Sequence, residues 1–227
     1  MSNLPECAVW LYGSHSRGDA DAESDIDLFV ASDEDIPPEA INVGAFRLRS
    51  PGSVSRYSWS EVEGMAAYGS LFLHHIRLEG CPLYEASSQE GRLGGILSRM
   101  SGYRLAERDL RGFRAVLEDV ARSLGSGGAE IFELSVLGTV LRHASILGCW
   151  LLGRPSFGRT TPVDRFVTYT GLPSSISRGF REFYRFRLFV EGRLQKGMLP
   201  RQPASAVWLS RAREVVDCME AVKNDRG

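Results

Sequence analysis

The pattern of apolar and polar positions changes character near residue 86. Before that point, short apolar runs alternate with glycine, proline and polar residues, which is typical of short strands joined by turns. After it, apolar residues recur at helical spacing over long segments. This change predicts an α+β protein in which a small mixed sheet with helices, residues 1–86, is followed by an all-α helical bundle, residues 87–227.

Four strands and two helices are expected in the first part. The strands are predicted at Cys7–Tyr12, Asp25–Ala31, Val43–Arg49 and Ser53–Ser58. A short helix over Ser14–Asp19, with Ser14 as its N-cap, is expected to join the first two strands. A second helix is expected to begin at Trp59–Glu61, with Ser60 as its cap, and to continue over Val62–Glu79.

About four helices are expected in the second part, at Ile96–Leu124, Ala129–Leu152, Ser177–Lys196 and Ala204–Lys223. Residues 153–171, which contain two prolines, are expected to form a long connection. The most apolar segment, residues 134–153, is interrupted by Arg142 and His143. It therefore predicts a buried helix rather than a membrane span, and no membrane association is expected.

Charge is distributed unevenly, although the formal net charge of the chain is only −1. Residues 1–35 contain nine acidic side chains and one basic side chain, Arg17, whereas residues 176–213 contain nine basic and two acidic ones. In this second region, phenylalanines interleave with arginines between Phe180 and Phe189. That spacing favours a helix that buries its aromatic side and exposes its arginines. Stacking of nucleic-acid bases on the aromatic rings is the alternative.

The composition and the cysteines indicate the kind of protein. The 43% hydrophobic and 24% charged residues are typical of a soluble globular protein. Four scattered cysteines form no CxxC pair and have no histidine at zinc-ligand spacing, so reduced and mostly buried thiols are expected. The N-terminus lacks the basic and apolar regions of a secretory signal. A cytoplasmic location is therefore expected.

The stretch LYGSHSRGDADAESDIDLFV, residues 11–30, contains the residues best suited to chemistry. Asp25 and Asp27 are two positions apart on an expected strand, so their side chains are predicted to project from one face. Two such carboxylates suit Mg²⁺, which is commonly bound by one or two carboxylates together with substrate phosphates. A pair of these ions can clamp the attacking and leaving oxygens of a phosphoryl-type transfer.

The residues between the first two strands suit a phosphate. Gly13 lets a phosphate approach the backbone, and the Ser14 hydroxyl can donate a hydrogen bond to it. Arg17 lies one turn later and can pair with a triphosphate.

With these residues the sequence resembles a known family. GSHSRG followed by SDIDLFV is similar to the G-S-x-x-R-G … S-D-x-D-L/F pattern of the nucleotidyltransferase superfamily typified by DNA polymerase β. The resemblance is strong over about residues 8–31 and weaker over Val54–Tyr84. Within the superfamily, the chain resembles small prokaryotic members. These include minimal nucleotidyltransferases that work with helical HEPN partners and aminoglycoside nucleotidyltransferases with a helical C-terminal domain.

The resemblance implies roles for six residues. Gly13, Ser14, Arg17 and Gly18 are expected to bind the nucleotide phosphates, and Asp25 and Asp27 are expected to be the catalytic ligands of Mg²⁺, with two ions bound.

The implied reaction is transfer of a nucleoside monophosphate from an NTP, with ATP expected as the donor, to an acceptor hydroxyl on a protein, an RNA such as tRNA, or a small molecule. The alternative is a catalytically weakened nucleotide-binding or antitoxin-like interaction module of a toxin–antitoxin pair. In either case the helical part is the expected surface for a partner protein or a second copy of the chain. The sequence does not define the acceptor.

A third carboxylate, which active members of the family usually carry on a later strand, is hard to place. Ser53 or Ser55 falls near the expected position, and no Asp or Glu occurs between Ala40 and Ser60. Three hypotheses remain at this stage. The acid comes from elsewhere, such as Glu61 or the helical part; two carboxylates suffice; or the protein binds nucleotide without turnover.

Overall fold

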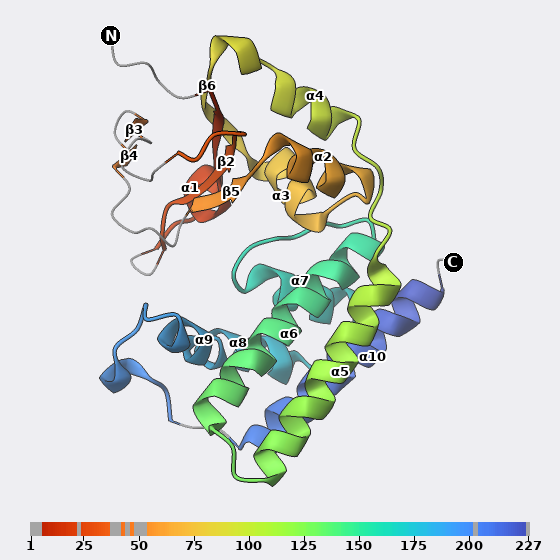
Figure 1. The fold of residues 1–227 in the computed structure, drawn as a ribbon. Helices are drawn as coiled ribbons and strands as arrows, with labels where there is room; N and C mark the ends of the chain where they lie inside the picture. Colours follow the sequence, from red (N-terminus) through yellow and green to blue (C-terminus); the bar gives the residue numbers. More distant parts are fainter. Residues whose placement is uncertain are drawn as a thin grey trace. The chain divides into compact units, whose positions relative to one another are not determined.

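The computed structural model describes residues 6–21, 24–36, 42–43, 46–47, 54–201 and 204–225. The chain divides into two compact units, residues 1–104 and 105–227 (Figure 1). A small mixed sheet with helices is followed by a helical region, which confirms the expected α+β class.

The elements of the first unit follow the chain in this order: β1 (Ala8–Tyr12), α1 (Gly13–Arg17), β2 (Asp27–Ala31), β3 (Asn42–Val43), β4 (Phe46–Arg47), β5 (Val54–Tyr57), α2 (Trp59–Ala67), α3 (Leu71–Glu79), β6 (Cys81–Glu85), the 3₁₀ helix η3 (Ser87–Gln89) and α4 (Arg92–Ser98). Four of the strands form one sheet in the order β5-β2-β1-β6, and β3 pairs with β4 separately.

The register of the four-stranded sheet places the polar end of β2 beside the end of β1. These two strands are antiparallel, and Tyr12 lies opposite Asp27. On the other side β2 pairs with β5 in parallel, where Phe29 lies opposite Ser55. The first two strands therefore meet at the point where α1 leaves the sheet.

Side chains alternate between the two faces of the sheet, as the strand period requires. One face carries Tyr12 and Phe29, which pack with Trp59 of α2, Leu73 of α3 and Leu93 of α4. These three helices lie on the same side of the sheet (Figure 1). The opposite face carries a second buried cluster of Cys7, Val9, Leu11, Leu28, Val30 and Ile36.

Several expected boundaries differ in the structure because local contacts decide them. Ser58, not Ser60, caps α2, since its side chain accepts from the Glu61 backbone in a reciprocal capping box. The expected helix over residues 62–79 is broken at Gly69, whose φ is 72°. A β-carbon there would lie 2.3 Å from the Gly102 carbonyl oxygen, so glycine allows this close approach.

Three further predictions are corrected in the same way. Ser14 lies inside α1, whose N-cap position is Tyr12. β2 begins at Asp27, so Asp25 precedes the strand instead of starting it. The predicted strand Val43–Arg49 overlaps two short strands that pair with each other, β3 and β4. The first compact unit extends to residue 104, and within it α4 packs against α2 and α3.

The second unit contains helices of unequal length: α5 (Ala106–Gly125), α6 (Glu130–Leu151), α7 (Thr161–Thr170), α8 (Ser174–Phe183), α9 (Arg185–Val190), the 3₁₀ helix η4 (Lys196–Met198) and α10 (Ser205–Asn224). The expected long connection over residues 153–171 thus includes α7. The expected helix over residues 177–196 is divided into α8, α9 and η4.

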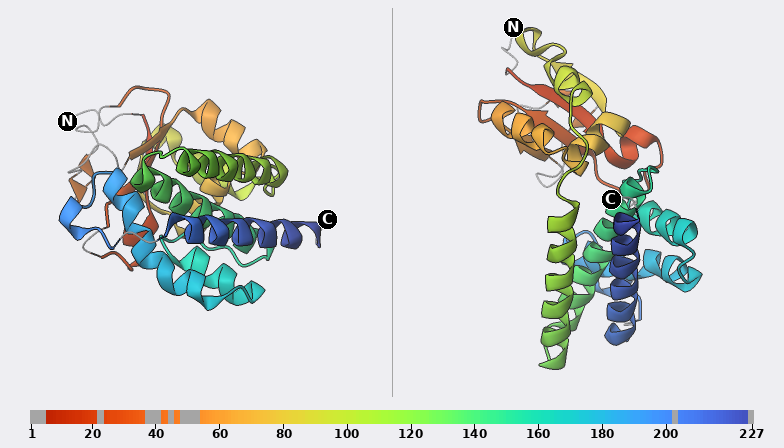
Figure 2. Two further views of the ribbon diagram at one scale, coloured as in Figure 1. Left: turned by 90° about the horizontal axis from the view of Figure 1, so that it is seen from below. Right: turned by 90° about the vertical axis from the view of Figure 1, so that its right-hand side faces the viewer.

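The long helices α5 and α10 lie side by side and run antiparallel (Figure 2). Lys223 pairs with Glu107 at one end, and Arg114 pairs with Asp217 further along. The neighbouring helix α6 packs against both and against α7 and α9. Among the described residues, α6 is the one helix long and apolar enough to cross a membrane by length and composition, and 67% of its apolar window is buried. This burial agrees with the prediction of a buried helix.

The aromatic and basic residues of α8 divide as the helical period predicts. Phe180 and Phe183 are buried, and the Phe183 ring stacks on Trp208 of α10 at 3.9 Å between centroids. Arg178 and Arg181 are exposed. The aromatic side of this helix is therefore part of the core.

Candidate active site

Gly13 and Asp27 lie next to each other in the expected site. A β-carbon at Gly13 would lie 2.4 Å from Oδ2 of Asp27, inside the distance at which two such atoms can stand. The φ of Gly13 is 75°, a conformation that L side chains rarely adopt. Glycine is needed at position 13 for two reasons. The turn into α1 requires a positive φ, and the Asp27 carboxylate occupies the space that a side chain would take.

The charges of Asp25 and Asp27 both affect the pKa of Tyr12. Burial raises the pKa of the Tyr12 hydroxyl to about 12, the Ser55 hydrogen bond opposes this shift, and the charges of Asp27 and Asp25 add to it. The charges of both carboxylates therefore reach Tyr12, although Asp25 lies outside the strand.

A serine and a tyrosine stand near the expected position of the third carboxylate. The Tyr12 hydroxyl lies 3.0 Å from the Ser55 hydroxyl oxygen, so the two groups share a hydrogen bond between β1 and β5. The other candidate position, Ser53, lies outside the described residues.

Glu61 was the nearest acid in the sequence, but its carboxylate is used elsewhere. It accepts hydrogen bonds from the backbone N–H of Ser58, at 2.7 Å, and from the Ser58 hydroxyl, at 2.9 Å. These bonds close the capping box at the start of α2. In the described part of the chain, no group of three or more His, Cys, Asp or Glu side chains is placed to hold a metal.

Arg17 lies on the same short helix as Gly13 but contacts acids of the protein. Its Nη1 is 2.5 Å from Oε2 of Glu79, the last residue of α3. Its Nε and Nη2 are 3.2 and 3.1 Å from the two carboxylate oxygens of Asp19. The arginine expected to bind a triphosphate is therefore placed between two carboxylates.

Glu79 connects several residues of the site, and sequence reasoning missed it. The same carboxylate oxygen that binds Arg17 lies 2.8 Å from Nε2 of His75. The His75 ring in turn packs edge-on against Tyr12, with 5.3 Å between the ring centroids. The Ser16 hydroxyl donates to the Glu79 backbone carbonyl. Glu79 is four residues after His75 on a helix, and this spacing was the available signal.

Ser14 and Gly18 define the path of α1. The Ser14 carbonyl accepts the backbone N–H groups of Gly18 and of Asp19, the latter at 3.0 Å. Gly18 has a φ of 77° and ends the helix. Gly13, Ser14, Arg17 and Gly18 therefore form one tight turn and helix beside Asp27.

The donor atoms of this site fit Mg²⁺. Two carboxylates from Asp25 and Asp27 are oxygen ligands of the kind that the ion prefers, with phosphates able to complete its coordination. On the side of Gly13, the Asp27 carboxylate faces a residue that has no side chain.

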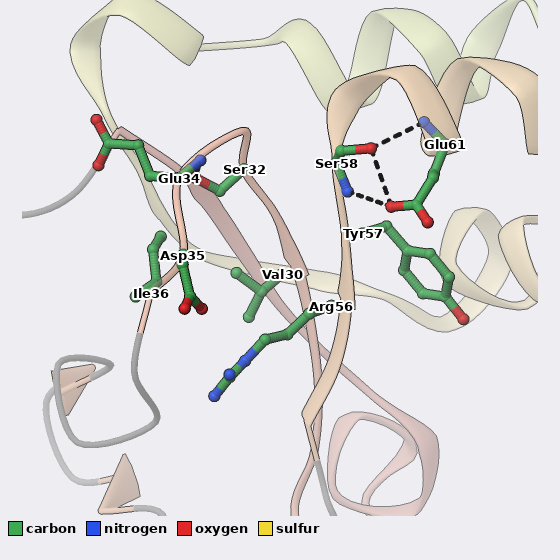
Figure 3. A pocket seen from close by; sticks show the side chains of 9 residues that line it. All are labelled: Val30, Ser32, Glu34, Asp35, Ile36, Arg56, Tyr57, Ser58 and Glu61. Carbon is green, nitrogen blue, oxygen red and sulfur yellow. Dashed lines mark hydrogen bonds between the residues drawn. The ribbon is translucent and has the colours of Figure 1, made fainter.

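A separate shallow pocket of about 200 Å³ lies beside the C-terminal ends of β2 and β5. Ser32, Asp35, Arg56 and Glu61 are among its lining residues (Figure 3). Since Asp27 begins β2, this pocket lies at the other end of the strand from the Gly13–Asp27 contact.

Comparison with protein families agrees with the resemblance found in the sequence. The family model of the nucleotidyltransferase domain matches residues 2–49, which include α1 and both aspartates. The match is consistent with the polymerase-β-like nucleotidyltransferase superfamily and supports transfer of a nucleoside monophosphate as the general reaction. A search of curated proteins returned no match.

Proposed function

We propose that this protein is a Mg²⁺-dependent nucleotidyltransferase that transfers the nucleoside monophosphate of an NTP, with ATP as the first donor to test, to an acceptor hydroxyl. The observation that carries the proposal is the contact between Gly13 and Asp27. It joins the turn expected to bind phosphate to a carboxylate expected to bind metal. The nucleotidyltransferase family match to residues 2–49 supports the same reaction class.

Four residues of the site have direct parts in the proposed reaction. Asp25 and Asp27 hold Mg²⁺, which when bound offsets the charge that develops on the phosphate oxygens. Gly13 leaves room for a phosphate beside the Asp27 carboxylate, and the Ser14 hydroxyl donates to the triphosphate. The acceptor oxygen attacks the α-phosphorus, the bond to the β-phosphate oxygen breaks, and pyrophosphate leaves.

The acceptor hydroxyl must lose a proton to a base when it attacks. The described residues place no third carboxylate beside Asp25 and Asp27 to serve as that base. Tyr12 is unsuited to this task, because its pKa of about 12 keeps the hydroxyl protonated at neutral pH. The Tyr12 and Ser55 hydroxyls are suited to hydrogen-bond an acceptor. In this proposal the proton passes to water or to the acceptor's own groups.

The test is incubation of the protein with labelled NTPs, Mg²⁺ and a panel of protein, tRNA and small-molecule acceptors. The wild-type chain is expected to label one acceptor class and to release pyrophosphate. The Asp25→Asn, Asp27→Asn double variant is expected to lose this labelling while its circular dichroism is unchanged. Glu63→Gln, which removes a carboxylate that pairs with Arg92, is the matched control. Labelling by the double variant at the wild-type rate would overturn the proposal.

A non-catalytic nucleotide-binding module is the second candidate. The hydrogen-bonded Tyr12 and Ser55 side chains near the expected third acid favour it. In that case calorimetry would detect Mg²⁺-dependent NTP binding, no acceptor would be labelled, and Asp25→Asn, Asp27→Asn would weaken only the binding.

A further inference from the structure

Arg17 is held by two carboxylates of the protein. Its Nε donates to Asp19 and its Nη1 donates to Glu79, and its Nη2 lies 3.1 Å from the second carboxylate oxygen of Asp19 as an ion pair. One positive charge is also set against two negative ones, so Arg17 in this arrangement adds little positive potential to the site.

The Glu79 side of this arrangement is the more sheltered. The side chains of Arg17 and Glu79 are 23% and 16% exposed, whereas that of Asp19 is 54% exposed. Charges that are partly removed from solvent are screened less than surface charges. The Glu79 carboxylate therefore has the larger effect on any anion that approaches Arg17.

Glu79 is also held in place and ionised. Burial raises the pKa of its carboxyl, but hydrogen bonds and charges from His75 and Arg17 outweigh this and hold the pKa below its usual range. Ser16, the neighbour of Arg17, binds the Glu79 backbone. Two consecutive side chains of α1 are thus attached to the last residue of α3.

We propose that Glu79 is a positioning counter-ion for Arg17 that lowers the affinity of the site for polyphosphates, both the triphosphate of the substrate and the pyrophosphate product. This inference rests on the proposed function. A polyphosphate that binds Arg17 must share it with Glu79, and after transfer Glu79 retains Arg17 as pyrophosphate leaves. The carboxylate thus limits how tightly the product is held.

Calorimetric titration of the Mg²⁺-loaded protein with pyrophosphate, and separately with a non-hydrolysable ATP analogue, tests this role. Glu79→Gln keeps an oxygen for the Arg17 hydrogen bond and removes the charge. It is expected to bind both ligands roughly tenfold more tightly than wild type, given Coulomb energies at partly exposed positions. In the transfer assay the KM for NTP and the inhibition constant of pyrophosphate are expected to fall together.

Glu63→Gln is the matched control, since it removes an equal charge from an arginine pair elsewhere in the same unit, and it is expected to leave both affinities unchanged. Asp19→Asn supplies a second variant at an exposed position that does not depend on the α1–α3 contact. It is expected to shift the affinities in the same direction by a smaller factor. Unchanged or weaker pyrophosphate binding by both folded variants would overturn the role of Glu79 and leave the transferase proposal standing. Absence of any nucleotide binding by the wild-type protein would overturn both.

Discussion

Gly13 and Asp27 stand so close that a β-carbon on the first would lie 2.4 Å from a carboxylate oxygen of the second. The residue that follows β1 and the first residue of β2 therefore leave no space between them for one additional carbon atom. The site depends on this contact in ways that substitution can measure.

Gly13→Ala is expected to abolish transfer and to destabilise the protein, because it combines a positive φ with a clash on Asp27. The backbone strain alone costs about 1–2 kcal/mol. Gly18→Ala is the matched control, since Gly18 has a nearly equal φ of 77° and nothing within 4 Å of the added carbon. Urea unfolding should show similar strain in both variants, with an additional loss of stability for Gly13→Ala. Equal activities in the two variants would show that the clash has no effect on the site.

The Tyr12–Ser55 hydrogen bond is expected to couple β1 to β5. Its hydroxyl groups are 3.0 Å apart and partly buried, so each single replacement, Tyr12→Phe or Ser55→Ala, should cost about 0.5–1.5 kcal/mol. In the double variant the losses should be less than additive, because both changes remove the same bond. Thermal and urea unfolding of the four proteins measure this coupling. Strict additivity would contradict the bond.

Stability is expected to fall between pH 6.5 and pH 4 because of His74. This side chain is 2% exposed and its Nε2 donates to the Ser101 carbonyl at 3.1 Å. Burial and the charge of Arg77 lower its pKa from 6.5 to about 4. The unfolded chain therefore binds a proton that the native protein does not, and stability present above pH 6.5 is lost as the pH falls.

The loss from His74 should amount to about 1–2 kcal/mol between pH 7 and pH 5. Urea unfolding at these two pH values measures it. His74→Gln should reduce the slope without abolishing it, because desolvation also lowers the pKa of His143 to about 4. The range from pH 7 to pH 5 excludes most of the contribution of Glu79 to the pH dependence of stability. The lowered pKa of that carboxyl means that its stabilising effect is lost only below its ordinary value of 4.5. An equal slope in wild type and His74→Gln would assign the pH dependence to other groups.

Glu61 is expected to be structural and not the third acid. Glu61→Gln keeps a capping-box side chain while removing the charge, so transfer activity should remain at the wild-type level. Ser58→Ala should destabilise α2 by about 0.5–2 kcal/mol, the usual cost of losing an N-cap, without changing the KM for NTP. Loss of transfer by a well-folded Glu61→Gln protein would instead place this carboxylate in the reaction.

The sequence predicted the strands and the glycine turn of the site because these features are local. β1 and β2 are apolar runs of the right length, and Gly13 and Gly18 fall at positions with positive φ. The break between α2 and α3 was not predictable from periodicity, since it depends on the approach of the Gly102 carbonyl to Gly69. The contact of Arg17 with Glu79 was equally hidden, because it joins residues 62 positions apart.

The antiparallel register that sets Tyr12 opposite Asp27 has a consequence for how this site tolerates change. A shift of one residue along a strand turns every side chain to the other face. The Asp27 carboxylate is therefore located by the hydrogen-bond ladder, not by its distance along the chain from Gly13. Residues could be inserted after Gly18 without moving this carboxylate, whereas a single insertion within β1 or β2 would turn the proposed metal ligand away from the turn at Gly13.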